Sequence, residues 1–202
     1  MGGVAKGQIV REVDALGGEI AKNAERALTQ IKLLNTTKGP SVWSTRVQID
    51  KYRYREEMRK ILEKEKNLYL RQGLVEELII EKDRVIGLKT KTGEIYNAKS
   101  IVLTPGTFLR GVVHIGKEMI EAGRWGELPS VGLANSLKEL GFNIKRFNTG
   151  TTPRIDIKSI DLSKFEIDEG EKTAISLSFD TKPRVWENQI PSYKGSTNTE
   201  TI

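Results

Sequence analysis

Residues 67–107 alternate short β-prone runs with tight turns, and this pattern restricts the fold more than any other part of the chain. The runs LVEELIIE, VIGLKTK and EIYNAKS are separated by turn residues at 82–84 and 92–93. Short β-rich runs of this kind predict an antiparallel meander. The next run, Ser100–Thr104, is apolar, which is typical of a strand buried on both faces of a central sheet. It stops at Pro105-Gly106-Thr107.

Three other stretches have apolar residues at helical spacing. Residues 8–16 form the first, and the second runs from Thr45, a potential N-cap, to about Lys66. The third runs from Ser130, also a good N-cap, to Leu140, where Gly141 is a natural stop. Helices on both sides of a meander predict an α/β fold.

Composition excludes several classes of protein. The 202 residues include no cysteine and one histidine, His114, which excludes disulfides, thiolate metal sites and a histidine-based zinc site within this sequence. No apolar run approaches the roughly 18 residues that a membrane-spanning helix needs. Residues 1–10 lack the charged and apolar regions of a signal peptide.

Charge and composition change near residue 150. The chain has a net charge of +6, yet residues 151–202 contain seven basic and nine acidic residues, so the positive excess lies in residues 1–150. A basic front portion is compatible with RNA binding, although charge alone favours a solvated lysine-rich surface. We therefore expect one domain over residues 1–150 and the incomplete start of a second over residues 151–202.

Two glycine-containing stretches are candidates for ligand binding. Gly2-Gly3-Val4-Ala5-Lys6-Gly7 precedes a predicted helix, where glycines allow close backbone approach and free amides suit an anion. It matches neither a dinucleotide fingerprint nor a P-loop, and a flexible terminus would explain it too. The apolar run that ends at Pro105-Gly106-Thr107 is typical of flavoproteins with two dinucleotide-binding folds, although an ordinary meander has similar turns.

Long stretches resemble one family. GGVAKGQIVREVDALGG, VLTPGTFLRG, HIGKEMIEAGRWGELPS and NTGTTPRIDIKSIDLSKF are similar to the tRNA uridine 5-carboxymethylaminomethyl modification enzymes, the MnmG or GidA family. The resemblance implies part of a glutathione-reductase-like, Rossmann-type FAD-binding domain with a β-meander, followed by the start of an inserted second domain. It also implies that the nucleotide fingerprint of a longer enzyme precedes Met1.

The resemblance assigns roles by position. It implies FAD contacts at Val75, on the adenine side, and at Ser130. It also places Gly2, Gly3 and Lys6 in a loop near the flavin, and Gly106 and Thr107 in the turn beside the flavin. Arg46, Arg124 and Arg154 fall in matching basic motifs and are candidates for tRNA or substrate contact, with surface salt bridging as the alternative. No catalytic side chain and no metal ligand is assigned.

The family's activity implies FAD reduced by NADH, methylene-tetrahydrofolate as one-carbon donor, and a tRNA substrate. It also implies a cytoplasmic homodimer that works with the MnmE GTPase, away from membranes. Two alternatives stay open. One is a general FAD-dependent oxidoreductase acting on small molecules. The other is a non-catalytic remnant or RNA-binding module, suggested by departures such as Asn148, which replaces a family lysine.

Overall fold

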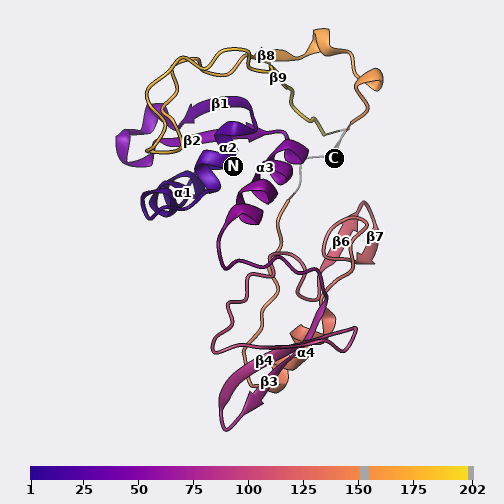
Figure 1. Ribbon diagram of the computed structural model, residues 1–202. Coiled ribbons are helices and arrows are strands. Elements are labelled where there is room, and N and C mark those ends of the chain that lie inside the picture. The colour runs from indigo at the N-terminus through magenta and orange to yellow at the C-terminus, as the bar shows by residue number, and fades with distance from the viewer. Residues whose placement is uncertain (151–154, 200–202) are drawn as a thin grey trace. The chain divides into compact units, whose positions relative to one another are not determined.

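The chain folds as two compact units of helices and small antiparallel sheets (Figure 1). The computed structural model describes residues 1–150 and 155–199. Residues 1–70 and 155–199 make up the first unit, and residues 71–150 make up the second. Residues 155–199 pack with the first 70 residues, and the assignment of residues 1–150 and 151–202 to two domains stays a prediction.

The first unit is built around a two-stranded antiparallel ribbon of β1 and β2. Its regular elements are α1 (Lys6–Ala15), α2 (Ile20–Arg26), β1 (Leu28–Leu34), β2 (Ser44–Ile49), α3 (Lys51–Lys64), β8 (Glu166–Asp168) and β9 (Ser192–Lys194). Short 3-10 turns lie at Thr36–Lys38, Pro40–Val42, Ile157–Ser159 and Leu162–Lys164. The helix predicted over residues 8–16 is confirmed as α1.

The second predicted helix begins later than its apolar spacing suggests. Thr45 lies within β2 instead of capping a helix, and Val47 faces Ile31 of β1 across the ribbon. Asp50 is the true N-cap, because its Oδ1 accepts hydrogen bonds from the amides of Tyr52 (2.9 Å) and Arg53 (3.2 Å). The start at Thr45 was therefore wrong, because pairing with β1 determines the conformation of residues 44–49.

Seven buried residues form the core of the first unit. They come from α2, from both strands of the ribbon and from the last part of the chain: Ala21, Ala24, Ile31, Val47, Ala174, Leu177 and Trp186. The alanines let α2 approach the ribbon closely, and Leu177 and Trp186 of residues 155–199, the late segment, belong to the same buried cluster. The late segment is thus part of this core.

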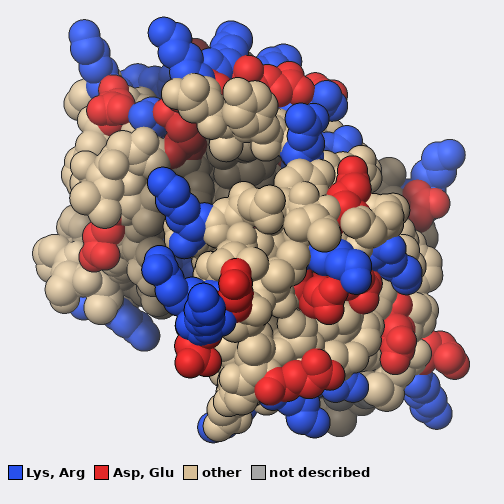
Figure 2. All heavy atoms as spheres, turned by 60° about the horizontal axis from the view of Figure 1, so that its bottom comes forward, with Lys and Arg blue, Asp and Glu red and all other residues tan. Residues whose placement is uncertain are grey.

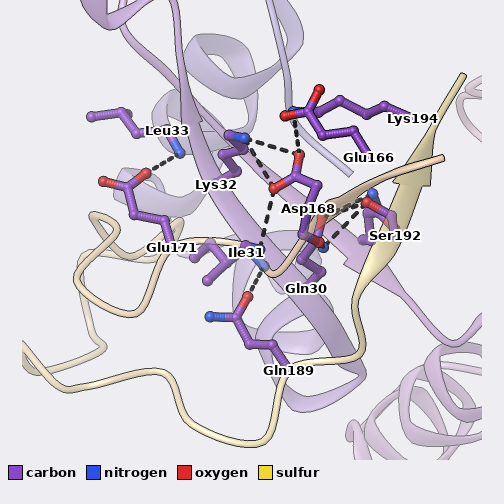
Figure 3. A network of polar contacts seen from close by, with 12 residues as sticks. Gln30, Ile31, Lys32, Leu33, Glu166, Asp168, Glu171, Gln189, Ser192 and Lys194 are labelled. Carbon is purple, nitrogen blue, oxygen red and sulfur yellow. Dashed lines mark hydrogen bonds and ion pairs between the residues drawn. The ribbon is translucent and has the colours of Figure 1, made fainter. Parts of the chain in front are cut away.

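Late loops also cover the free edge of β1 (Figure 3). The Ile31 amide donates to Gln189 Oε1 (2.8 Å), and the Leu33 amide donates to Glu171 Oε2 (2.9 Å). The Glu171 amide in turn donates to the Ile31 carbonyl (2.9 Å). Backbone groups that a third strand would have paired are satisfied by loop residues, so this edge is closed.

Asp168 anchors the same loops through charge (Figure 3). Its carboxylate is 7% exposed and accepts from Lys32 Nζ at 3.0 and 2.9 Å. The hydrogen bond from Lys32 is the main cause that lowers the pKa of Asp168, and the Gly170 amide adds to it. The buried side chain of Gln30 donates through Nε2 to the Asp168 carbonyl (2.7 Å). β1 and the end of β8 are therefore joined by an ion pair and by a hydrogen bond.

The N-terminal residues line the other edge of the ribbon. Gly2 bridges Arg46 of β2, and the Gly3 amide donates to the Thr45 carbonyl (3.0 Å). A Cβ on Gly2 would lie far inside van der Waals distance of the Thr45 carbonyl oxygen, whereas a Cβ on Gly3 would meet no heavy atom within 4 Å. Of these two glycines, only Gly2 lies so close to β2 that no side chain would fit.

In the second unit, β3 (Val75–Glu81), β4 (Arg84–Thr90) and β5 (Ile95–Asn97) form an antiparallel sheet in that order. The predicted meander is confirmed. β6 (Val112–Ile115) and β7 (Glu118–Glu121) form a hairpin, and α4 (Val131–Glu139) packs on β3. The contact between α4 and β3 shows that both elements belong to the second unit.

The apolar run of residues 100–104 is not a strand in this structure. The described residues of the second unit pair only β3, β4 and β5 in its larger sheet, so the run has no neighbouring strand. Val102 is 86% exposed as a result. The prediction of a strand buried on both faces was wrong for the structure described here, because such burial requires partner strands and covering helices.

Replacing the buried carboxylate of Asp168 should weaken the first unit in a pH-dependent way. At pH 7 we expect Asp168→Asn to lower the free energy of unfolding by about 1–3 kcal/mol, because Lys32 loses its charged partner. The folded-state pKa lies below the ordinary 3.8, so this stabilisation is present above that pH and is lost as the pH falls through the folded value.

Urea unfolding of both proteins between pH 7 and pH 3 tests this. The exposed Glu63→Gln, which removes the partner of Arg59 on α3, should give no measurable change. An Asp168→Asn deficit that is equal at all pH values would contradict the role of the carboxylate charge.

Gly2 and Gly3 form a matched pair for a second measurement. Both have positive φ, +71° and +90°, so an alanine at either position is strained by about 1–2 kcal/mol. Gly2→Ala adds a clash with Thr45 and should reduce the free energy of unfolding clearly more than Gly3→Ala does. Equal losses in urea unfolding would show that the Gly2 contact with β2 is not close.

Candidate functional site

A tight glycine loop precedes α1. Gly2, Gly3 and Ala5 all have positive φ, and the Gly7 amide donates to the Gly3 carbonyl (2.7 Å). The Ser44 hydroxyl also donates to the Gly3 carbonyl, which fixes the loop on β2. The space beside the Gly3 Cα is open, so a ligand group can approach the backbone there.

Two cations lie beside this loop. Lys6 is the first residue of α1, and Arg46 pairs with Gly2 across the bridge to β2. After burial, Arg46 and Lys6 are the causes that lower the pKa of the Met1 amine. Arg46 Nε is buried and has no hydrogen-bond partner among the described residues. The structure therefore brings Gly2, Gly3, Lys6 and Arg46 together, and an anionic oxygen would satisfy the Nε donor.

In the second unit, Ser130 lies between β3 and the turn that follows residue 104. It is the N-cap residue of α4, as predicted, but its hydroxyl makes no capping bond. Instead the Oγ donates to the Val75 carbonyl (3.3 Å), while the Ser130 amide donates to the Phe108 carbonyl (2.8 Å). Val75 and Ser130, two predicted cofactor contacts, are thus direct neighbours.

The predicted turn is tied to the same place. Gly106 has φ +56° with open space beside its Cα, and the Phe108 amide donates to the Pro105 carbonyl (3.0 Å). Thr107 Oγ1 donates to the Gly123 carbonyl (2.7 Å). Because Phe108 also bonds to Ser130, four predicted cofactor residues (Val75, Gly106, Thr107, Ser130) belong to one hydrogen-bonded region.

The arginines predicted to contact RNA differ in their surroundings. Arg124 forms a two-pronged ion pair with Glu127, with N–O distances of 2.6 and 3.2 Å, and lies over the Phe108 ring. This is the surface salt bridge that the alternative interpretation expected. Arg46 has an unsatisfied donor instead. Arg154 lies outside the described residues.

Sequence reasoning missed two buried carboxylates that position the late segment. Glu25 Oε1 accepts from the amides of Leu177 (2.6 Å) and Ser178 (2.9 Å), and Glu25 Oε2 accepts from the Thr181 hydroxyl. Asp14 accepts from the Ser178 hydroxyl (2.8 Å) and the Phe179 amide (2.7 Å). Their helical spacing resembles that of ordinary solvated residues, so only the tertiary structure identifies them.

Charge on the surface is mixed. Figure 2 shows Lys and Arg side chains interspersed with Asp and Glu over the face in view. Within residues 1–150 and 155–199, no cluster of three metal-ligating side chains is present. No helix in the same ranges is long and apolar enough to cross a membrane.

Comparisons with known proteins identify the family of the chain. The family model described as "Glucose inhibited division protein A" matches residues 1–202. A protein of Thermodesulfovibrio yellowstonii named tRNA uridine 5-carboxymethylaminomethyl modification enzyme MnmG is 48% identical over 100% of this chain and 32% of its own length. A protein of the same name from Exiguobacterium sibiricum is 50% identical over 96% of this chain and 31% of its own.

Solved structures are similar too. GidA of Aquifex aeolicus superposes with a TM-score of 0.86 and 43% identity, over 96% of this chain and 33% of that one. A second crystal form of that protein gives a TM-score of 0.87 and 42% identity. With a family model that matches its whole length, the chain belongs to the GidA family, and it spans about a third of the length of the relatives it matches.

Proposed function

We propose that the chain is part of a flavin-dependent enzyme that adds a carboxymethylaminomethyl group to carbon 5 of the wobble uridine in tRNA. The names of its relatives support this reaction. The observation that carries it in this chain is the open glycine loop beside Arg46, whose buried Nε has no partner among the described residues. Such a loop suits the approach of a flat, anionic cofactor.

Each unit, taken by itself, presents residues that suit contact with FAD. In the first unit, Gly3 provides open backbone, the close contact of Gly2 with Thr45 fixes the loop on β2, and Lys6 and Arg46 provide positive charge. In the second unit, Gly106 provides open backbone. FAD would supply the redox chemistry, while the protein binds and orients it.

The hydroxyls of Thr107 and Ser130 contribute in a restricted way. Both already donate to backbone carbonyls, of Gly123 and Val75 respectively. A cofactor group could therefore only donate to these hydroxyl oxygens, whose lone pairs remain available. Their main contribution is to fix the turn after residue 104 against the start of α4.

The proposal extends to the parts that the family resemblance implies. The glutathione-reductase-like, Rossmann-type domain would give the run of residues 100–104 the neighbouring strands that it lacks here, and residues 151–202 would begin the inserted domain. NADH would reduce the flavin and methylene-tetrahydrofolate would supply the carbon. The enzyme would act on tRNA in the cytoplasm. It would work as a homodimer, with the MnmE GTPase as its partner.

A chimera tests the proposal. Residues 1–202 replace the matching third of the 48%-identical Thermodesulfovibrio yellowstonii enzyme, and the chimera is expressed in a strain that lacks its own copy. We expect co-purified FAD, seen in the visible absorbance spectrum, and recovery of the modified wobble uridine, measured by mass spectrometry of tRNA nucleosides. The isolated 202-residue chain should hold far less than stoichiometric FAD.

Arg46 gives the matched variant. In the chimera, Arg46→Met should weaken FAD binding about tenfold, because a charge-assisted hydrogen bond is lost. Arg59→Met, on the exposed side of α3, is the control and should bind FAD normally. A chimera that binds FAD and oxidises NADH but leaves tRNA unmodified would favour the small-molecule oxidoreductase. Unchanged FAD affinity in Arg46→Met would remove Arg46 from the site.

A further inference from the structure

A polar cleft, separate from the glycine loop, lies in the first unit. It has a volume of about 610 Å³ and is formed by α2, the first turn of α3 and residues 180–187. Four cations line it: Lys22, Arg26, Arg53 and Arg184. None of these residues belongs to the glycine loop, and none was singled out by the sequence.

Arg184 is held in a fixed orientation. Its guanidinium lies 3.9 Å from the centre of the Trp186 ring, and Trp186 is only 3% exposed. The Trp186 Nε1 donates to the Ala174 carbonyl (2.9 Å), which fixes the ring in turn. Among the described residues, the Arg184 side chain makes no ion pair or hydrogen bond. A stacked arginine of this kind presents its N–H edge to a ligand at low entropic cost.

The acidic residues of the cleft are mostly occupied. Glu25 points inward and accepts from the 177–181 segment, and Asp180 pairs with Lys22 (3.3 Å). Among the described residues, Glu187 is the one lining carboxylate with neither an ion pair nor a side-chain hydrogen bond, whereas Glu25 has hydrogen bonds but no cationic partner. The side chain of Arg53 is similarly unpaired there. Arg53 and Arg184 are therefore the lining cations without an ion pair, and of the two carboxylates without one, Glu25 is turned toward the 177–181 segment by its hydrogen bonds.

An exposed aromatic residue adjoins the cleft in sequence. Tyr52, next to Arg53, is 61% exposed, and the cationic groups of Lys51 and Arg55 lie 4.7 and 6.0 Å from its ring centre. Exposed aromatic rings among cations are the usual means by which proteins stack unpaired bases while neutralising phosphates. The first turn of α3 combines both properties.

We propose that this cleft binds the phosphodiester backbone of single-stranded RNA, with Arg184 and Arg53 as the phosphate contacts and Tyr52 as a stacking surface. A phosphate site follows from the cleft alone. The choice of RNA over a free nucleotide rests on the proposed tRNA-modifying function. Glu187 opposes binding and sets its strength.

Fluorescence anisotropy with the 202-residue chain and a labelled oligouridylate tests the proposal. Arg184→Ala and Arg53→Ala should each weaken binding about tenfold and lower the slope of log affinity against log salt by about one. Glu187→Gln should tighten binding about two- to threefold, because it removes a repulsive charge. Arg59→Ala, exposed on the same helix and paired with Glu63, is the control and should bind as the wild type does.

Arg184→Lys separates charge from stacking, and it should recover only part of the loss. Thermal unfolding followed by circular dichroism checks that each variant is folded. If Arg184→Ala does not fold, Arg53→Ala and Glu187→Gln decide, and unchanged affinity in both would overturn the proposal. So would wild-type affinity in a folded Arg184→Ala.

Competition distinguishes the sources of phosphate. Inorganic phosphate and ADP, at equal phosphate concentration, should displace the oligouridylate much less effectively than unlabelled oligouridylate does. If ADP displaced the labelled oligouridylate at a lower phosphate concentration than unlabelled oligouridylate does, the assignment to RNA would be overturned. The readout is independent of flavin, so a chimera without FAD would contradict the proposed function and leave this result unaffected.

Discussion

The closed edge of β1 is the constraint on which the first unit depends. A two-stranded ribbon is marginal on its own, since each strand leaves one row of backbone groups unpaired. Here Gln189 and Glu171, far along the chain, satisfy one row, and residues 1–3 pair with the other edge on β2. The glycine loop therefore stands on a ribbon whose opposite edge is held by the late segment.

The same late segment also forms one wall of the polar cleft. Asp14 and Glu25 hold residues 177–181 through buried hydrogen bonds, and Trp186 enters the core beside Leu177. Trp186 then carries Arg184 on its ring. The late segment therefore supports both the ribbon under the glycine loop and the cleft. Loss of the hydrogen bonds to Asp14 and Glu25 would affect both surfaces together.

How far the sequence predicted the fold follows from the range of each interaction. The meander and the helices after Ala5 and Ser130 were predicted, because turn residues and apolar spacing act locally. β2 was missed, because its six residues adopt a strand only by pairing with β1. The run of residues 100–104 was misassigned for the same reason, since its apolar character requires neighbours and does not supply them.

Prediction of the candidate sites from the sequence has the same limit, because the sequence does not show which charges are already paired. Glycines 2, 3 and 106, which the sequence predicts to allow close backbone approach, have positive φ, a local conformation that glycine adopts readily. Arginines give no such signal: Arg124 is neutralised by Glu127, Arg46 keeps a buried donor without a partner, and Arg184 is fixed by a ring. What an arginine can bind depends on which of its charges and donors the fold has already used. That compensation is a property of packing between distant segments, so it appears only when the chain is folded.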